Sequence, residues 1–109
     1  MNEIDATILD RLFAVIESRK GADPSESWTA KLLAGGPDKA AKKLGEEAVE
    51  TIIAALTQDN TALAAESADL LYHLLVLWAA KGLAPEDVWR ALRAREGKSG
   101  VAEKASRKN

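Results

Sequence analysis

The segment over residues 61–81 constrains the fold of this chain more than any other feature, because it is apolar on nearly every side. Its length and composition predict a single helix of about six turns, which Gly82 ends. A helix that is hydrophobic all round has to be buried. A chain of 109 residues provides too few other helices to enclose it. We therefore expect a helical bundle that is completed by homodimerisation.

The composition of the whole chain also favours helix. Hydrophobic residues make up 47% of the sequence and aromatic residues only 5%, and Ala and Leu carry most of the apolar content. We predict an all-α chain of four to five helices in a domain over residues 1–97, followed by a basic tail over residues 98–109. The expected helices run from an N-cap at Asp5 to the break at Gly21, then over residues 28–34 (a short one), 37–56, 61–81 and 85–95.

Charge and cysteine content exclude several classes of function. The net charge of -2 and the pI near 5.4 provide no basic field for nucleic acid. The chain has no cysteine, which excludes disulfides and thiolate metal sites. Residues 1–5 lack the cationic start and apolar run of a signal peptide, and Glu66, Asp69 and His73 argue against a membrane span. A cytoplasmic protein without nucleic-acid or membrane partners is the simplest interpretation.

Acidic residues cluster at helical spacing on both sides of a short connection. Residues three or four apart share a helix face, so Glu46, Glu47 and Glu50 form one set. Glu66 and Asp69 form another, and the connection over residues 58–60 makes the two helices antiparallel neighbours. Counted outward from that connection, Glu50 and Asp69 come level. The carboxylates are therefore expected to converge between the two helices.

Like charges gathered in a partly apolar place need a counter-ion. Oxygen ligands without cysteine or paired histidine favour a hard divalent cation, Mg²⁺ or Mn²⁺. Acidic residues at this spacing more often solvate an exposed face, but the apolar neighbours of Glu66 and Asp69 argue for burial. A ferritin-like di-iron site would need Glu-x-x-His motifs, which neither Glu50 nor Glu66 begins. We therefore predict a magnesium site between these helices.

Several motifs resemble those of known enzymes. The pattern Glu46-Glu47-Ala48-Val49-Glu50, followed by Glu66-Ser67-Ala68-Asp69, resembles the EExxE and ExxD signature of the MazG-like all-α nucleoside triphosphate pyrophosphohydrolases. Nearly the whole chain is similar to one family among them, the phosphoribosyl-ATP pyrophosphohydrolases of histidine biosynthesis. The similar stretches include residues 27–32 (SWTAKL), 43–47 (KLGEE), 69–73 (DLLYH) and 99–107 (SGVAEKASR). Trp28 stands where Tyr is expected in that family.

The resemblance implies a dimeric, Mg²⁺-dependent enzyme that hydrolyses phosphoribosyl-ATP to phosphoribosyl-AMP and pyrophosphate. It assigns four residues as metal ligands: Glu47, Glu50, Glu66 and Asp69. It makes Glu46 a further ligand or the residue that positions water, so that Glu46 and Glu47 are the candidate catalytic residues.

Cationic residues ahead of the acidic helix are candidate phosphate contacts. The resemblance favours this role for Lys31, Lys39 and Lys43, whereas an ordinary helix ion pair is the simpler role for Lys42. Gly45 inside the same helix costs about 1 kcal/mol relative to Ala, which a close approach by a backbone or a ligand would explain. The basic tail either folds over bound phosphate or remains solvated.

Two other residues could touch substrate. Trp28 could stack on a purine, or it could anchor a core or an interface. His73 lies four residues after Asp69 and could orient a carboxylate or contact substrate, although a lone histidine on an apolar helix is more often a hydrogen-bonded core residue.

Two rival functions fit parts of the pattern. A house-cleaning pyrophosphatase for non-standard (d)NTPs would share the carboxylate site and differ in its base and sugar pocket, so only the loop and tail motifs argue against it. A non-catalytic helical dimerisation module would use the acidic patch to bind a basic partner. Such a module would fail to bind Mg²⁺ at millimolar concentration.

Overall fold

The computed structural model describes residues 3–98 and 100–107, and the regular secondary structure within them is helical. The helices are α1 (Ile8–Ser18), α2 (Trp28–Ala34), α3 (Gly36–Thr57), α4 (Asn60–Lys81), α5 (Pro85–Arg95) and α6 (Gly100–Ser106). The all-α prediction is confirmed, and each of the helices predicted over residues 1–97 is present. The tail adds α6, a short helix where none was predicted.

Capping side chains and glycine set several helix boundaries. The Ser27 hydroxyl accepts a hydrogen bond from the Ala30 amide (3.1 Å) at the start of α2. The Asp59 carboxylate accepts one from the Ala62 amide (2.9 Å) at the start of α4. Gly82 ends α4 in the left-handed region at φ 74°, where glycine is unstrained. These three boundaries agree with the predicted ones.

The prediction that Asp5 caps the first helix is wrong. The Asp5 carboxylate accepts a hydrogen bond from the Thr7 amide (2.9 Å), and α1 begins only at Ile8. A short aspartate side chain stabilises a turn by this contact as readily as it caps a helix.

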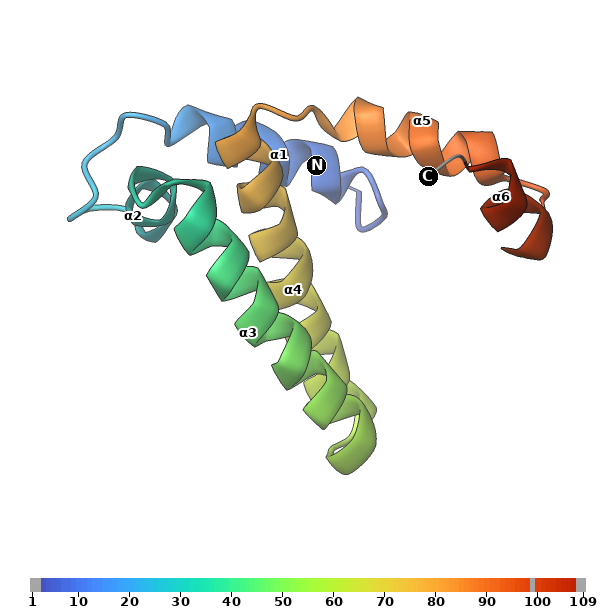
Figure 1. Cartoon of the computed structure of the whole chain (residues 1–109). Coiled ribbons are helices and arrows are strands. Elements are labelled where there is room, and N and C mark those ends of the chain that lie inside the picture. Colours follow the sequence, from blue (N-terminus) through green and yellow to red (C-terminus); the bar gives the residue numbers. More distant parts are fainter. Residues whose placement is uncertain (1–2, 99, 108–109) are drawn as a thin grey trace.

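Helices α3 and α4 form a long antiparallel hairpin, and the other helices lie around one end of it (Figure 1). Helix α1 packs against α4, and α2 packs against both α3 and α4. Helix α5 follows the end of α4 and extends outward from this end of the hairpin, with α6 beyond it (Figure 1). The core lies where α1, α2, α3 and α4 meet and consists of Ile16, Leu32, Ala40, Leu75, Val76 and Ala79.

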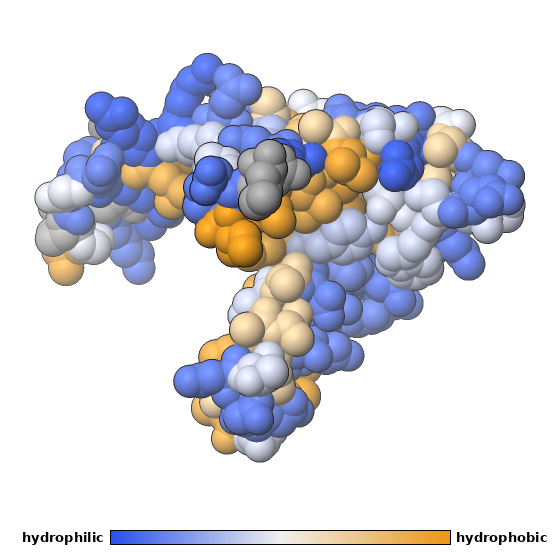
Figure 2. Space-filling model, turned by 180° about the vertical axis from the view of Figure 1, so that it is seen from behind, coloured by the Kyte–Doolittle hydropathy of each residue, from blue (hydrophilic) through white to orange (hydrophobic). Residues whose placement is uncertain are grey.

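The remainder of the hairpin projects away from the core and exposes an apolar face (Figure 1). On α3, Leu56 is 80% exposed and Ile52 is 58% exposed, and Val49 and Ile53 are also exposed. Hydrophobic surface appears along the edges of the hairpin and beneath the layer formed by α1 and α5 (Figure 2). The chain alone therefore leaves uncovered much of the apolar face predicted for residues 37–56.

By length and composition alone α4 could cross a membrane, but a buried core helix meets the same two criteria. Its surroundings are those of a core helix. It packs against α1, α2 and α3, and it carries a buried histidine, His73, one turn from Asp69.

Candidate metal and substrate site

Three carboxylates from the two helices of the hairpin converge. Glu47 on α3 and Glu66 and Asp69 on α4 each place one oxygen within 4.8 Å of the other two. The spacing of three residues puts Glu66 and Asp69 on one face of α4, and the antiparallel packing sets Glu47 opposite them. The predicted convergence across the hairpin is therefore present for these three residues.

Glu50 and Glu46 lie at the edge of this group. Glu50 is exposed and lies outside the set of three. The negative charge of Glu50 nevertheless acts on both Glu47 and Glu66. Glu46 is also exposed, and its Oε1 lies 3.4 Å from the Nζ of Lys43. The residue opposite Asp69 is thus Glu47 rather than Glu50.

The carboxylates disturb one another's ionisation. Burial raises the pKa of Glu47, and the nearby charge of Glu50 raises it further. Burial also raises the pKa of Glu66, with Glu50 again the largest contributing charge. In the protein without metal, both side chains therefore hold a proton more tightly than an exposed glutamate does.

The carboxylate oxygens fit a bound cation. The Oε2 atoms of Glu47 and Glu66 are buried and have no hydrogen-bond partner within the described residues. A buried, unpaired carboxylate oxygen is unfavourable, and a cation would provide its partner. The donors are all oxygen, which suits a hard divalent ion. This acidic cluster could therefore bind a metal ion.

A second group of opposite charge surrounds Trp28. The Nζ atoms of Lys31 and Lys43 lie 5.9 Å from the centre of its ring, and that of Lys39 lies 6.0 Å away. Trp28 is 49% exposed, so it is not a core residue of this chain. Three cations around one aromatic face repel one another and attract an anion. Four of the predicted substrate residues thus come together.

Lys43 joins the two groups. Its Nζ faces the Trp28 ring and also lies 3.4 Å from Glu46 Oε1, one residue before Glu47. Lys42, by contrast, is exposed and lies outside the group of lysines at the ring. An acidic centre and a basic aromatic patch therefore adjoin along the first half of α3.

Two adjacent glycines set the path of Lys39. Gly36 starts α3 at φ 79°, a left-handed conformation that side chains rarely adopt. At Gly35, a Cβ would lie 2.3 Å from the Cδ of Lys39 and 2.8 Å from its Cβ. The Lys39 side chain therefore passes directly over the backbone of Gly35.

His73 is buried next to the acidic cluster. Its Nδ1 lies 2.8 Å from the Asp69 carbonyl oxygen, which can only accept, so Nδ1 carries the proton. Burial raises the pKa of Glu47, and the positive charge of His73, when present, offsets part of that rise. The histidine is thus held as a hydrogen-bonded core residue beside the site, with its other ring nitrogen available to a neighbour.

Sequence patterns did not reveal a contact that joins the two parts of the site. The hydroxyl groups of Thr29 on α2 and Tyr72 on α4 are hydrogen-bonded across 43 residues of sequence. The Tyr72 ring also packs edge-on against His73, with ring centres 4.9 Å apart. Both hydroxyls belong to motifs noted above, but their pairing depends on how α2 docks on α4.

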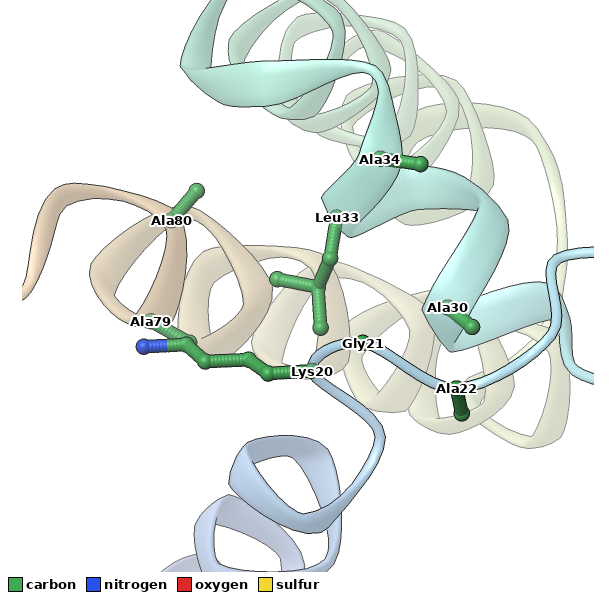
Figure 3. Close-up of a pocket in the computed structure, with 8 residues that line it drawn as sticks. All are labelled: Lys20, Gly21, Ala22, Ala30, Leu33, Ala34, Ala79 and Ala80. Atoms are coloured by element: carbon green, nitrogen blue, oxygen red, sulfur yellow. The ribbon is translucent and has the colours of Figure 1, made fainter.

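A cavity of about 350 Å³ lies apart from this site, between the α1–α2 connection, α2 and the end of α4 (Figure 3). Lys20 and Leu33 line it together with glycine and alanine residues. It contains none of the predicted site residues. This cavity therefore does not coincide with the acidic cluster.

Comparisons with known proteins agree with the resemblance. The family model described as phosphoribosyl-ATP pyrophosphohydrolase matches residues 9–96. A phosphoribosyl-ATP pyrophosphatase of Azospirillum brasilense is 58% identical over 99% of this chain and 97% of its own length. That of Caulobacter vibrioides is 66% identical over 92% of both chains, and that of Parvibaculum lavamentivorans is 60% identical over 94% of both. The chain therefore belongs to the phosphoribosyl-ATP pyrophosphohydrolase family.

Proposed function

We propose that this chain hydrolyses phosphoribosyl-ATP to phosphoribosyl-AMP and pyrophosphate, an early step of histidine biosynthesis. The observation that carries the proposal is the junction at Lys43 and Glu46 between an acidic centre and a basic aromatic patch. A nucleotide triphosphate bound with metal needs both, because its phosphates are anionic and its base is aromatic. The names of the relatives specify which nucleotide.

Glu47, Glu66 and Asp69 are the proposed metal ligands, and Glu50 completes the set from the edge of the cluster. We infer Mg²⁺, with Mn²⁺ as a substitute, because every donor is a carboxylate oxygen. The bound ion would neutralise charge on the triphosphate oxygens. The role of the protein is to hold four carboxylates in a geometry that they would not keep by themselves.

Glu46 and Glu47 are the proposed catalytic carboxylates. Glu47 belongs to the acidic centre and Glu46 pairs with Lys43 beside it, so the bond between the α and β phosphates would lie against these two carboxylates. One of them accepts a proton as water attacks phosphorus and pyrophosphate leaves. Lys43 would donate a hydrogen bond to the departing phosphate oxygen.

Lys31 and Lys39 are the proposed contacts to the remaining phosphates, including the 5-phosphate of the phosphoribosyl group. Trp28, which is half exposed among them, offers a face on which the purine could stack. His73 supports the site through the hydrogen bond of its Nδ1 to the carbonyl oxygen of Asp69. Lys98, Lys104 and Arg107 of the tail could add cations, and Lys108 lies outside the described residues.

A homodimer is the proposed assembly. The exposed apolar residues of α3 recur at helical spacing with Gly45, where an added Cβ would meet no atom within 4 Å. This glycine is thus not required by packing within the chain. A second copy packed against Val49, Ile52 and Leu56 would cover them, and it would explain the space at Gly45.

Substrate comparison tests the proposal. The kcat/KM for phosphoribosyl-ATP should exceed those for ATP and common dNTPs at least about a hundredfold, since two charge-assisted contacts to the extra phosphate can support that factor. Pyrophosphate release at subsaturating substrate is the measurement. Comparable rates on simple nucleotides would favour the house-cleaning (d)NTP pyrophosphatase instead, with the metal site unchanged.

A further inference from the structure

Thr51 is the one side chain of α3 whose hydroxyl lies between the two ligand-bearing helices at the level of the acidic cluster in the described structure. Its Oγ1 lies 2.8 Å from the carbonyl oxygen of Glu47 on its own helix. It also lies 3.2 Å from the carbonyl oxygen of Glu66 on α4. The residue is half-buried, so the contacts are partly shielded from water. Thr51 therefore touches the backbone of two proposed metal ligands at once.

The first contact alone would be ordinary. A threonine inside a helix commonly donates to the carbonyl four residues before it, and Thr57 does so to Ile53 (2.8 Å). The second contact has no such local explanation, because Glu66 is 15 residues away on the neighbouring helix. The single hydroxyl proton can be donated to either carbonyl, so Thr51 connects α3 and α4 at this level.

The distance between the helices matters here more than elsewhere along the hairpin. The carboxylates of Glu47, Glu66 and Asp69 reach one another within 4.8 Å only because α3 and α4 lie close together. Their mutual repulsion pushes the helices apart in the absence of a cation. Ala54, fully buried one turn after Thr51, allows the close approach, and the Thr51 hydroxyl adds an attraction across the gap.

We propose that Thr51 is a positioning residue that fixes the spacing of Glu47 and Glu66 and thereby sets the affinity of the site for its divalent cation. The inference rests on the proposed metal site. Thr51 itself is not a ligand, because its hydroxyl is directed to backbone carbonyls. Partners that orient metal ligands typically change affinity by tenfold or more when they are lost.

The test is the affinity of the metal-free protein for Mn²⁺ in the absence of substrate. Titration calorimetry and the EPR signal of free Mn²⁺ measure the Kd. Thr51→Val removes the hydroxyl and keeps the shape, and it should raise the Kd about tenfold. Thr51→Ser keeps the hydroxyl and should stay within about threefold of the wild type. Thr57→Val removes the same local bond from an exposed site and should leave the Kd unchanged. The Mg²⁺ concentration for half-maximal activity should rise with the Kd in Thr51→Val, while kcat recovers at high Mg²⁺.

Two outcomes would overturn the inference. One is a Thr51→Val protein that binds Mn²⁺ as the wild type does, and the other is a Thr51→Ser protein as impaired as the valine variant. If Thr51→Val does not fold, Thr51→Ala, which suits a helix and adds no bulk, should show the same tenfold loss. Failure of the wild-type protein to bind Mn²⁺ would instead reject the metal site itself, so the two failures are distinguishable.

Discussion

The hydroxyl groups of Thr29 and Tyr72 form a hydrogen bond that ties α2 to α4. Thr29 follows Trp28, the ring around which the lysines gather, and Tyr72 precedes His73 beside the acidic cluster. The bond therefore connects the proposed substrate half of the site to the proposed metal half. Loss of this hydrogen bond should therefore first change the positions of Trp28 and Lys31 on α2.

We expect Tyr72→Phe to raise KM for phosphoribosyl-ATP between about twofold and tenfold, because a net hydrogen bond contributes about 0.5–1.5 kcal/mol. The Kd for Mn²⁺ should change little, since no metal ligand loses a contact. Steady-state kinetics of Tyr72→Phe, Thr29→Val and the double variant form a mutant cycle. Additive effects of the two substitutions would show that the hydroxyls do not act through each other.

Neutralising a proposed ligand should abolish turnover and spare the fold. Glu47→Gln and Asp69→Asn each remove a charge and little volume, so we expect at least about a hundredfold lower kcat at saturating Mg²⁺ with unchanged far-UV circular dichroism. Relief of repulsion should raise the melting temperature of the metal-free protein. Glu86→Gln, an exposed change on α5, is the control and should change neither kcat nor the melting temperature. Wild-type activity in either variant would remove that residue from the site.

The raised pKa values of Glu47 and Glu66 predict how the stability of the metal-free protein depends on pH. The folded state holds these protons more tightly than the unfolded state, so their contribution is present below the ordinary value of 4.5 and is lost as pH rises through the raised values. Glutamine mimics the protonated form. In urea unfolding with EDTA, the free energy of unfolding of the double variant Glu47→Gln/Glu66→Gln should therefore increase relative to that of the wild type as pH rises from 4.5 to 7. A difference independent of pH would contradict the burial of these carboxylates.

Each of the three lysines around Trp28 should make its own contribution to substrate recognition. Replacing Lys31, Lys39 or Lys43 by Ala should lower kcat/KM for phosphoribosyl-ATP by about 10- to 100-fold, as expected for a lost charge-assisted contact. Lys42→Ala is the matched control, because it removes the same charge from the same helix outside the group at the ring. An equal loss in Lys42→Ala would indicate general attraction of a polyanion rather than defined contacts.

The exposed face of α3 predicts the oligomeric state. Ile52→Lys places a charge in the proposed interface and should shift the protein from dimer to monomer in sedimentation equilibrium. The same change at Ile4, which is fully exposed ahead of α1, should leave the dimer intact. A monomeric wild-type protein would rule out the interface.

Much of the fold follows from local signals that the sequence displays. Ser27, Asp59 and Gly82 mark helix ends by chemistry that acts within four residues, and the spacing of Glu66 and Asp69 fixes their common face. The short connection then brings Glu47 opposite them. The long-range parts could not be predicted, because the Thr29–Tyr72 bond and the Thr51 contact to α4 depend on how whole helices dock and rotate.

Asp5 and the C-terminal tail show that local sequence signals do not fully determine where helices begin. An aspartate before an apolar run can cap a helix or stabilise a turn, and only the following backbone decides between them. Gly97 follows the end of α5 in the left-handed region, yet the seven residues from Gly100 to Ser106 form a further helix, α6. Breakers mark where a helix stops but not whether another begins.

Because the side chain of Lys39 passes over Gly35, the size of the residue at position 35 limits which side chain can be accommodated at position 39. A methyl group at position 35 would collide with the lysine stem at both Cβ and Cδ, so the side chain would have to leave the Trp28 ring. Among related sequences, a larger residue at position 35 should therefore accompany a shorter or differently directed residue at position 39. A cation displaced in this way would disappear from the substrate surface although the lysine itself remained in the sequence.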